Sequence, residues 1–102
     1  MDLKISKMLT ISTDHIKQET GEFLYENYDN SKPPICYNHD EFGFFVLCNR
    51  DYMKSLLEEQ TYTEIPHDLW LCMVLARTFD CDWLCLDGDG PIVKGLQTYE
   101  WE

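Results

Sequence analysis

Two carboxylates at close spacing are the first residues in this chain that suggest chemistry. Asp87 and Asp89 follow a short apolar run and alternate with Gly88 and Gly90. Carboxylate oxygens are the ligands that Mg²⁺ and Ca²⁺ prefer, so one interpretation is an ion or ligand site. An EF-hand loop also needs a Glu at its twelfth position, which is Thr98 when counted from Asp87. We favour the alternative, a Gly/Asp turn between strands, and expect neither a bound metal nor a cofactor.

Cysteine and histidine chemistry is the second possibility to test. The five cysteines include no Cys-x-x-Cys pair. On one extended strand, Cys81 and Cys85 would stand roughly 13 Å apart at about 3.3 Å per residue, too far for one zinc ion. A thiolate nucleophile needs an electropositive setting, and 8 Lys+Arg against 19 Asp+Glu provide little of it. No serine elbow, phosphate loop or His-Glu-x-x-His helix is present. We predict that the protein is not an enzyme and that its thiols are reduced and buried.

The acidic surplus, a formal net charge of -11, is the remaining chemical feature. Glu19, Glu22 and Glu26 recur every three to four residues along a predicted helix, about 4.5 and 6 Å apart at 1.5 Å of rise per residue. One DNA strand offers a phosphate about every 3.4 Å, so this row has a comparable spacing. The carboxylates that could extend the negative surface come in pairs: Glu58 with Glu59, Asp80 with Asp82, Asp87 with Asp89, and Glu100 with Glu102.

Such a surface complements the basic groove of a nucleic-acid-binding protein, because opposite potentials steer association. Direct binding of nucleic acid is disfavoured, since that requires Lys and Arg against the phosphates. The alternative interpretation is a solvated face that only keeps a small domain monomeric.

These side chains depend on the elements that position them. We expect a helix over 14–26 whose inward face carries Ile16, Thr20, Phe23 and Leu24, and a helix from Asn49 or Asp51 to Gln60. A third helix, 66–79, is apolar nearly all round, so we expect it to be buried on several sides or to leave one side available to a partner. The expected strands are 3–11, 35–37, 42–48 and 82–87, with a return strand beginning at 92–93 and a polar turn at 38–41.

This order predicts one α+β domain over 1–102: a mostly antiparallel sheet of about four to five strands with about three helices packed on it. Strand 82–87 lacks polar alternation and is expected in the centre of the sheet with both faces covered. Residues 99–101 are expected to close against the sheet edge. No apolar run approaches the roughly 18 residues of a membrane span, and no secretory signal is evident. We therefore expect a cytoplasmic protein without a membrane partner, as a monomer or homodimer.

The chain resembles an uncharacterised family of small bacterial proteins carried on plasmids, prophages and genomic islands. The resemblance is carried by Ile65-Pro66-His67-Asp68-Leu69 and by the run from Cys81 to Pro91, which ends in a Leu-Asp-x-Asp-Gly-Pro pattern. The segments 12–16 and 41–43 are similar as well, so the match covers most of the chain. It implies a mobile-element origin and no known catalytic residue.

By analogy with other small acidic proteins of mobile elements, the expected function is inhibition of host defence, as a DNA mimic of the anti-CRISPR or antirestriction type. Trp70 or Trp101 would supply an apolar anchor on the basic surface of a CRISPR effector or restriction enzyme. The partner-binding carboxylates would be Glu19, Glu22, Glu26, Asp80, Asp82, Asp87 and Asp89. Two other hypotheses stay open. One is a metal- or ligand-dependent activity centred on Asp87 and Asp89, and the other is a small regulatory interaction domain in which Trp70, Val74 and Arg77 are exposed.

Overall fold

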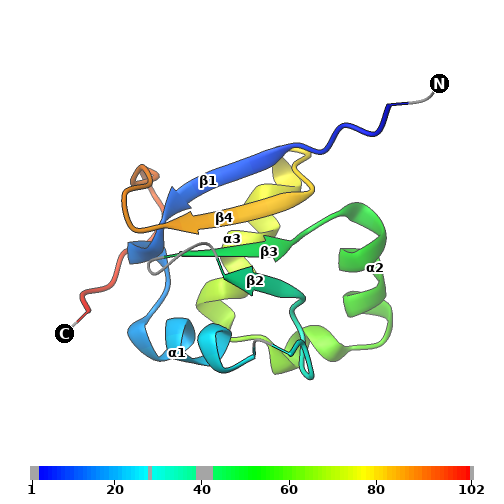
Figure 1. Cartoon of the computed structure of the whole chain (residues 1–102), viewed down its shortest axis with the longest axis horizontal. Coiled ribbons are helices and arrows are strands. Elements are labelled where there is room, and N and C mark those ends of the chain that lie inside the picture. Colours follow the sequence, from blue (N-terminus) through cyan, green and yellow to red (C-terminus); the bar gives the residue numbers. More distant parts are fainter. Residues whose placement is uncertain (1–2, 28, 39–42, 102) are drawn as a thin grey trace.

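The computed structural model describes residues 3–27, 29–38 and 43–101, and within them it confirms the predicted α+β class. Three α-helices pack on a four-stranded sheet, with α3 lying behind the strands in Figure 1. In chain order the elements are β1 (Met8–Ser12), the 3-10 helix η1 (Thr13–His15), α1 (Gln18–Glu26), β2 (Cys36–Asn38), β3 (Gly43–Leu47), α2 (Arg50–Glu58), the 3-10 helix η2 (Thr61–Glu64), α3 (His67–Thr78) and β4 (Trp83–Asp87). In these ranges no helix has the length and apolar character needed to cross a membrane.

The sheet has the strand order β1-β4-β3-β2, so β4 lies in its centre as predicted. β4 pairs antiparallel with β3 and parallel with β1, and β2 pairs antiparallel with β3. The sheet is therefore mixed and not mostly antiparallel. Because parallel neighbours cannot be joined by a tight hairpin, the chain between β1 and β4 passes through the helices before it returns alongside β1.

The two faces of the sheet differ in their cover. Leu84 and Leu86 of β4 are fully buried with Ile11 of β1, in a core that includes residues of every α-helix. On the opposite face, Trp83 lies against Tyr37 of β2 with ring centroids 6.2 Å apart, and Tyr37 is more than half exposed. The predicted cover on both faces of β4 is confirmed for its central residues, since Leu84, Cys85 and Leu86 are all buried, and Trp83 on the second face is half-buried.

The predicted helix over 14–26 is interrupted. Ser12 caps η1 through its hydroxyl, which accepts the Asp14 N–H at 3.0 Å, but Ile16 and Lys17 are extended and α1 begins only at Gln18. The reason lies on α3, where the buried carboxylate of Asp68 accepts the Lys17 N–H at 2.7 Å. The Lys17 N–H, which would donate to a backbone carbonyl in a continuous helix, thus donates to a side chain that is distant in the sequence.

The other helix boundaries follow the sequence closely. Asn49 caps α2, its side chain accepting the Tyr52 N–H at 2.8 Å. α3 follows Pro66 and buries Leu69 and Met73, while Val74 on its outer side is 40% exposed. The predicted polar turn at 38–41 lies mostly outside the described residues.

The predicted strand at 92–93 does not form, and residues 91–101 make an irregular C-terminal strap. His15, almost fully buried, accepts the Val93 N–H through Nε2 at 2.9 Å, so its Nδ1 carries the proton and donates to the Gln97 carbonyl at 2.9 Å. The Tyr99 N–H donates to the carbonyl of Asp14 at 2.7 Å. The strap therefore packs on η1 and the start of α1, and the expectation that 99–101 close against the sheet edge is wrong. The predicted first strand is also shorter, since residues 3–7 precede β1.

Candidate functional site

The segment Asp87–Pro91 forms a turn that follows β4 and is hydrogen-bonded to the end of β1. Oδ1 of Asp87 accepts the Asp89 N–H at 2.9 Å, and the carbonyl of Pro91 accepts the Ser12 N–H at 2.9 Å. Gly90 approaches the neighbouring strand so closely that a Cβ there would lie 2.6 Å from the carbonyl carbon and oxygen of Ile11. The turn therefore requires Asp87 as a hydrogen-bond acceptor and Gly90 because a side chain there would not fit, so the fold accounts for both residues. Across the described ranges, no group of three or more His, Cys, Asp or Glu side chains is placed to hold a metal ion.

The five cysteines are free and buried, as predicted. Burial raises the pKa of the Cys48 thiol to about 12, and the nearby Arg77 guanidinium offsets only part of that rise. Burial likewise raises the pKa of Cys72 to about 12 and raises that of Cys36. These three thiols therefore remain protonated at neutral pH and are poor nucleophiles.

Asp80 and Asp82 lie before β4 and are surrounded by cations. Arg77 donates to Asp80, and its Nη1 is 3.8 Å from Oδ1 of Asp82. Arg50 is 3.6 Å from Asp80, and the backbone N–H of Lys7 donates to Asp82 at 3.4 Å. The length of β4, roughly 16 Å at about 3.3 Å per residue, separates this group from Asp87 and Asp89.

The three glutamates of α1 are exposed, and the described ion pairs involve none of them. Glu22 and Glu26 line a cavity together with Asp89. Glu19 lines a smaller hollow beside Lys17. Of the seven carboxylates predicted from the sequence, the structure thus brings Glu22, Glu26 and Asp89 to one cavity and leaves Asp80 and Asp82 at the far end of β4.

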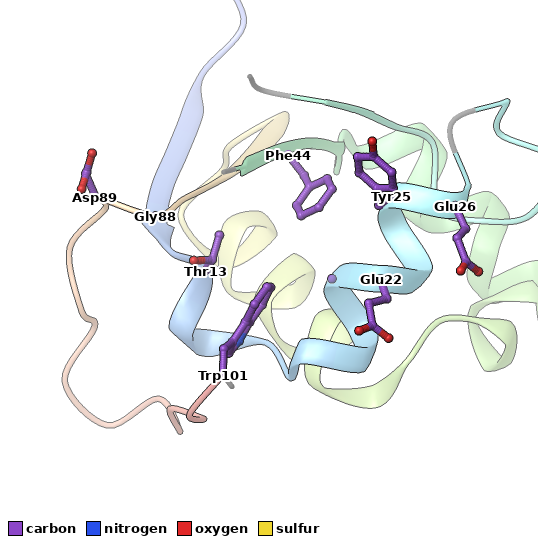
Figure 2. Close-up of a pocket in the computed structure, with 9 residues that line it drawn as sticks. Thr13, Glu22, Tyr25, Glu26, Phe44, Gly88, Asp89 and Trp101 are labelled. Carbon is purple, nitrogen blue, oxygen red and sulfur yellow. The ribbon is translucent and has the colours of Figure 1, made fainter. Parts of the chain in front are cut away.

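The cavity has a volume of about 610 Å³ and mixes apolar walls with an acidic rim. Figure 2 shows the rings of Phe44 and Trp101 approaching it from two sides, with Glu22 and Glu26 extending from α1 and the Asp89 carboxylate directed away from the rings. Among the described lining residues there is no Lys, Arg or His: they are Thr13, Gly21, Glu22, Tyr25, Glu26, Phe44, Gly88, Asp89 and Trp101.

Trp101 forms one wall of the cavity because α1 has a glycine beneath it. The indole Nε1–H donates to the carbonyl of Ile16 at 2.9 Å, and a Cβ on Gly21 would overlap the indole ring. A glycine inside a helix costs about 1 kcal/mol relative to alanine, and here it permits this close contact with the indole. The cavity itself was missed. The available signal was a glycine inside an amphipathic helix combined with a tryptophan near the end of the chain.

Trp70 occupies a different place from the acidic helix. It is half-buried and lies on Tyr62 of η2 with ring centroids 5.3 Å apart. Arg77, which was expected to be exposed with it, donates to the carbonyls of Cys48 and Cys81. The aromatic side chain beside the α1 glutamates is Trp101, the other anchor considered, which is 41% exposed.

Comparisons with known proteins add a family without a known activity. No curated protein and no solved structure matches this chain. Residues 8–101 match the model of the C-terminal domain of a family of unknown function, DUF5983. That range begins with β1 and ends at Trp101, so it includes the whole sheet, the helices and the strap. The chain therefore belongs to the family of unknown function DUF5983.

Proposed function

We propose that the protein is a small inhibitor, encoded by a phage or plasmid, that binds the basic nucleic-acid-binding surface of a host defence complex. The target class is a CRISPR effector or a restriction enzyme in the bacterial cytoplasm. The observation that carries this proposal is the row of exposed carboxylates on α1, Glu19, Glu22 and Glu26, which the described ion pairs leave without partners.

The distribution of the described charges supports a directional interaction. Arg50 and Arg77 cluster with Asp80 and Asp82 at the start of β4, so positive and negative groups offset one another there. Among the residues that the structure describes, the ion pairs give no such cluster of cations at the end of β4 or on the α1 face. A molecule with this asymmetry turns its negative end toward a basic groove, which raises the rate of encounter.

The inhibition would be competitive and would require no catalytic step. Carboxylates along α1 would occupy positions that phosphates occupy when nucleic acid is bound, so that protein and nucleic acid exclude each other. Contacts of this kind weaken as salt rises, because the screening length shortens from about 10 Å at 0.1 M to about 3 Å at 1 M. The proposal thus includes a salt-dependent affinity.

The test is displacement of a fluorescein-labelled DNA duplex from a purified restriction endonuclease and of target DNA from a purified CRISPR effector complex, measured by anisotropy. The wild-type protein is expected to displace the duplex. The triple variant Glu19→Lys/Glu22→Lys/Glu26→Lys should need at least about tenfold more protein, equivalent to about 1.4 kcal/mol. The matched control reverses the same number of exposed charges away from α1 in the chain, at Glu58 and Glu59 at the end of α2 and at Glu64 in η2.

Each outcome is decisive once circular dichroism has shown both variants to be folded. A loss confined to the α1 variant supports the proposal. An equal loss in both variants assigns the effect to net charge and removes the α1 face from it. If the wild-type protein displaces neither duplex at 50 mM salt, the proposed function is wrong.

The exposed side chains of Tyr37 and Met8 on the second face of the sheet favour a second candidate, a small interaction domain that pairs with a copy of itself. Tyr37 is 55% and Met8 47% exposed on this face, beside Trp83. The neighbouring side chains of this face are the uncharged Thr10, Trp83, Phe45 and Leu47, and Asp87 lies on the same face at the end of β4. A second copy of so acidic a chain would meet uncharged side chains over this part of the face, which limits the repulsion between the two copies.

Sedimentation velocity over a concentration series tests this second candidate. The wild-type protein should shift toward dimer as concentration rises, and Tyr37→Lys should abolish the shift. Tyr25→Lys, at a tyrosine of α1 that is also more than half exposed, is the control and should leave the shift unchanged. A wild-type protein that stays monomeric at 1 mM would exclude the homodimer.

A further inference from the structure

We propose that the cavity beside α1 seats an arginine side chain of the protein partner. The inference rests on the proposed function and deepens it, because it names the group that the basic surface would insert. The cavity volume, about 610 Å³, falls within the roughly 300–1,000 Å³ of typical ligand clefts. It therefore has room for an arginine together with part of the backbone that carries it.

The aromatic walls of the cavity are suited to a planar cation with an apolar stem. The rings of Phe44 and Trp101 project toward the cavity from β3 and from the C-terminal strap, and Tyr25 stands at its rim (Figure 2). A guanidinium is planar and weakly hydrated, so it stacks on aromatic faces and at the same time passes its methylene stem along apolar surface.

The rim supplies the charge that a guanidinium requires. Glu22 and Glu26 lie one helical turn apart on α1 and both line the cavity, Glu22 on the side of Trp101 and Glu26 further along α1 next to Tyr25 (Figure 2). Neither takes part in a described ion pair, and the described lining contains no cation. A carboxylate can accept two parallel N–H bonds from one guanidinium, an arrangement that a lysine ammonium cannot reproduce. Asp89 points away and adds only to the negative potential.

The Trp101 wall is held in place before any partner arrives. Its indole N–H is bonded to Ile16, and the preceding strap is bonded to Asp14 through Tyr99. Gly21 lets the ring lie directly on α1. A wall that is ordered in the free protein lowers the entropic cost of binding, which favours a specific insertion over a diffuse charge contact.

The experiment is a titration followed in ¹⁵N–¹H correlation spectra. The probe is the blocked pentapeptide Gly-Gly-Arg-Gly-Gly, and the matched control peptide carries citrulline, the neutral isostere of arginine. The arginine peptide should shift the Gly21 amide and the Trp101 indole resonances. The citrulline peptide should bind at least about tenfold more weakly, since it retains the shape but loses the charge.

Two protein variants separate the cavity from general acidity. Glu22→Gln/Glu26→Gln should weaken binding of the arginine peptide at least about tenfold, because it removes both rim charges without changing side-chain size. Glu19→Gln/Glu58→Gln removes the same number of charges outside the cavity lining and should leave binding within about twofold. All four positions are exposed, so both variants are expected to fold.

Equal binding of the two peptides would overturn the inference in favour of a neutral apolar occupant. Resonance shifts away from α1, equal loss in both variants, or no shift at 20 mM peptide would overturn it as well. The proposed function is judged separately by displacement of the duplex. Displacement without peptide binding rejects only the arginine site, and peptide binding without displacement rejects only the proposed target.

Discussion

Gly90 illustrates how much of the chemically suggestive Asp-Gly-Asp-Gly sequence serves the fold. The carbonyl of Ile11 on β1 occupies the space that a side chain at this position would need. The same turn brings Pro91 to the amide of Ser12. An aspartate and a glycine at these positions are therefore accounted for by an Asx-type turn and a close backbone approach.

We predict that Gly90→Ala lowers the free energy of unfolding by about 2 kcal/mol or more, because the new Cβ forces β1 and the turn apart. Gly95→Ala is the control: it has open space around it but a φ of +92°, so only backbone strain of about 1 kcal/mol is expected. Urea denaturation measures both. Equal losses in the two variants would show that the close approach to Ile11 carries no extra cost.

The buried thiols predict a loss of stability at alkaline pH. The pKa values of Cys48 and Cys72 rise from 9.0 to about 12 on folding, so their stabilisation is complete below pH 9 and is lost as pH rises toward 12. Each thiol should lower the free energy of unfolding by roughly 1 kcal/mol per pH unit in that window.

Urea denaturation between pH 8 and pH 11 measures how steeply the free energy of unfolding falls with pH. Cys72→Ala should make this fall less steep by the contribution of one thiol. The variant is also expected to be less stable at every pH, because it leaves a cavity in the core. An unchanged slope in Cys72→Ala would contradict the prediction, whatever its baseline stability.

At the scale of elements, Asp68 links α3 to α1. Its Oδ2 accepts the Lys17 N–H, and its Oδ1 accepts the Thr20 hydroxyl at 2.9 Å. Both Asp68 and Thr20 are buried. The orientation of α1, and with it the row of glutamates on its exposed side, therefore depends on a carboxylate 51 residues away from Lys17.

We predict that Asp68→Asn destabilises the protein by about 1.5–3 kcal/mol, because an amide has one acceptor oxygen where the carboxylate has two. Thr20→Val should cost about 1 kcal/mol. A double-mutant cycle by thermal and urea denaturation should give a coupling of at least about 0.5 kcal/mol. Additive losses would mean that the Thr20–Asp68 bond contributes little to the packing of α1 on α3.

At the scale of the whole molecule, charge is unevenly distributed along the sheet. The described cation cluster lies at the start of β4, and the α1 face beside the cavity is acidic. With a formal net charge of -11, repulsion among the carboxylates opposes the compact state. This repulsion is the cost of the surface on which the proposed function depends.

We predict that raising NaCl from 0.05 to 0.5 M stabilises the protein by on the order of 1 kcal/mol, or about 4–8 °C in the midpoint of thermal unfolding. The Glu19→Lys/Glu22→Lys/Glu26→Lys variant, which carries fewer uncompensated carboxylates, should respond less. Thermal melts by circular dichroism measure both proteins. A midpoint that falls with salt would show that the ion pairs around Arg77 outweigh the general repulsion.

Local sequence patterns were enough to predict the α+β class, the Asn49 cap, the buried thiols and the central place of β4. They failed where a remote group intervened: the carboxylate of Asp68 interrupts the predicted first helix, and the bonds to His15 hold the C-terminal strap away from a strand pairing. The same limit explains the grouping of the acidic residues, since Asp80 and Asp82 meet Arg77 while Glu22 and Glu26 do not.

The sequence by itself determined which faces are apolar, which turns are tight and how acidic the molecule is, because these properties depend on residue types within a few positions. Only the tertiary structure decided that the indole of Trp101 covers Gly21 and forms a cavity with Phe44 beside two glutamates. The physical reason is that an apolar face can be buried by any of several distant segments at similar free energy. Periodicity shows that a face must be covered, and three-dimensional packing selects what covers it.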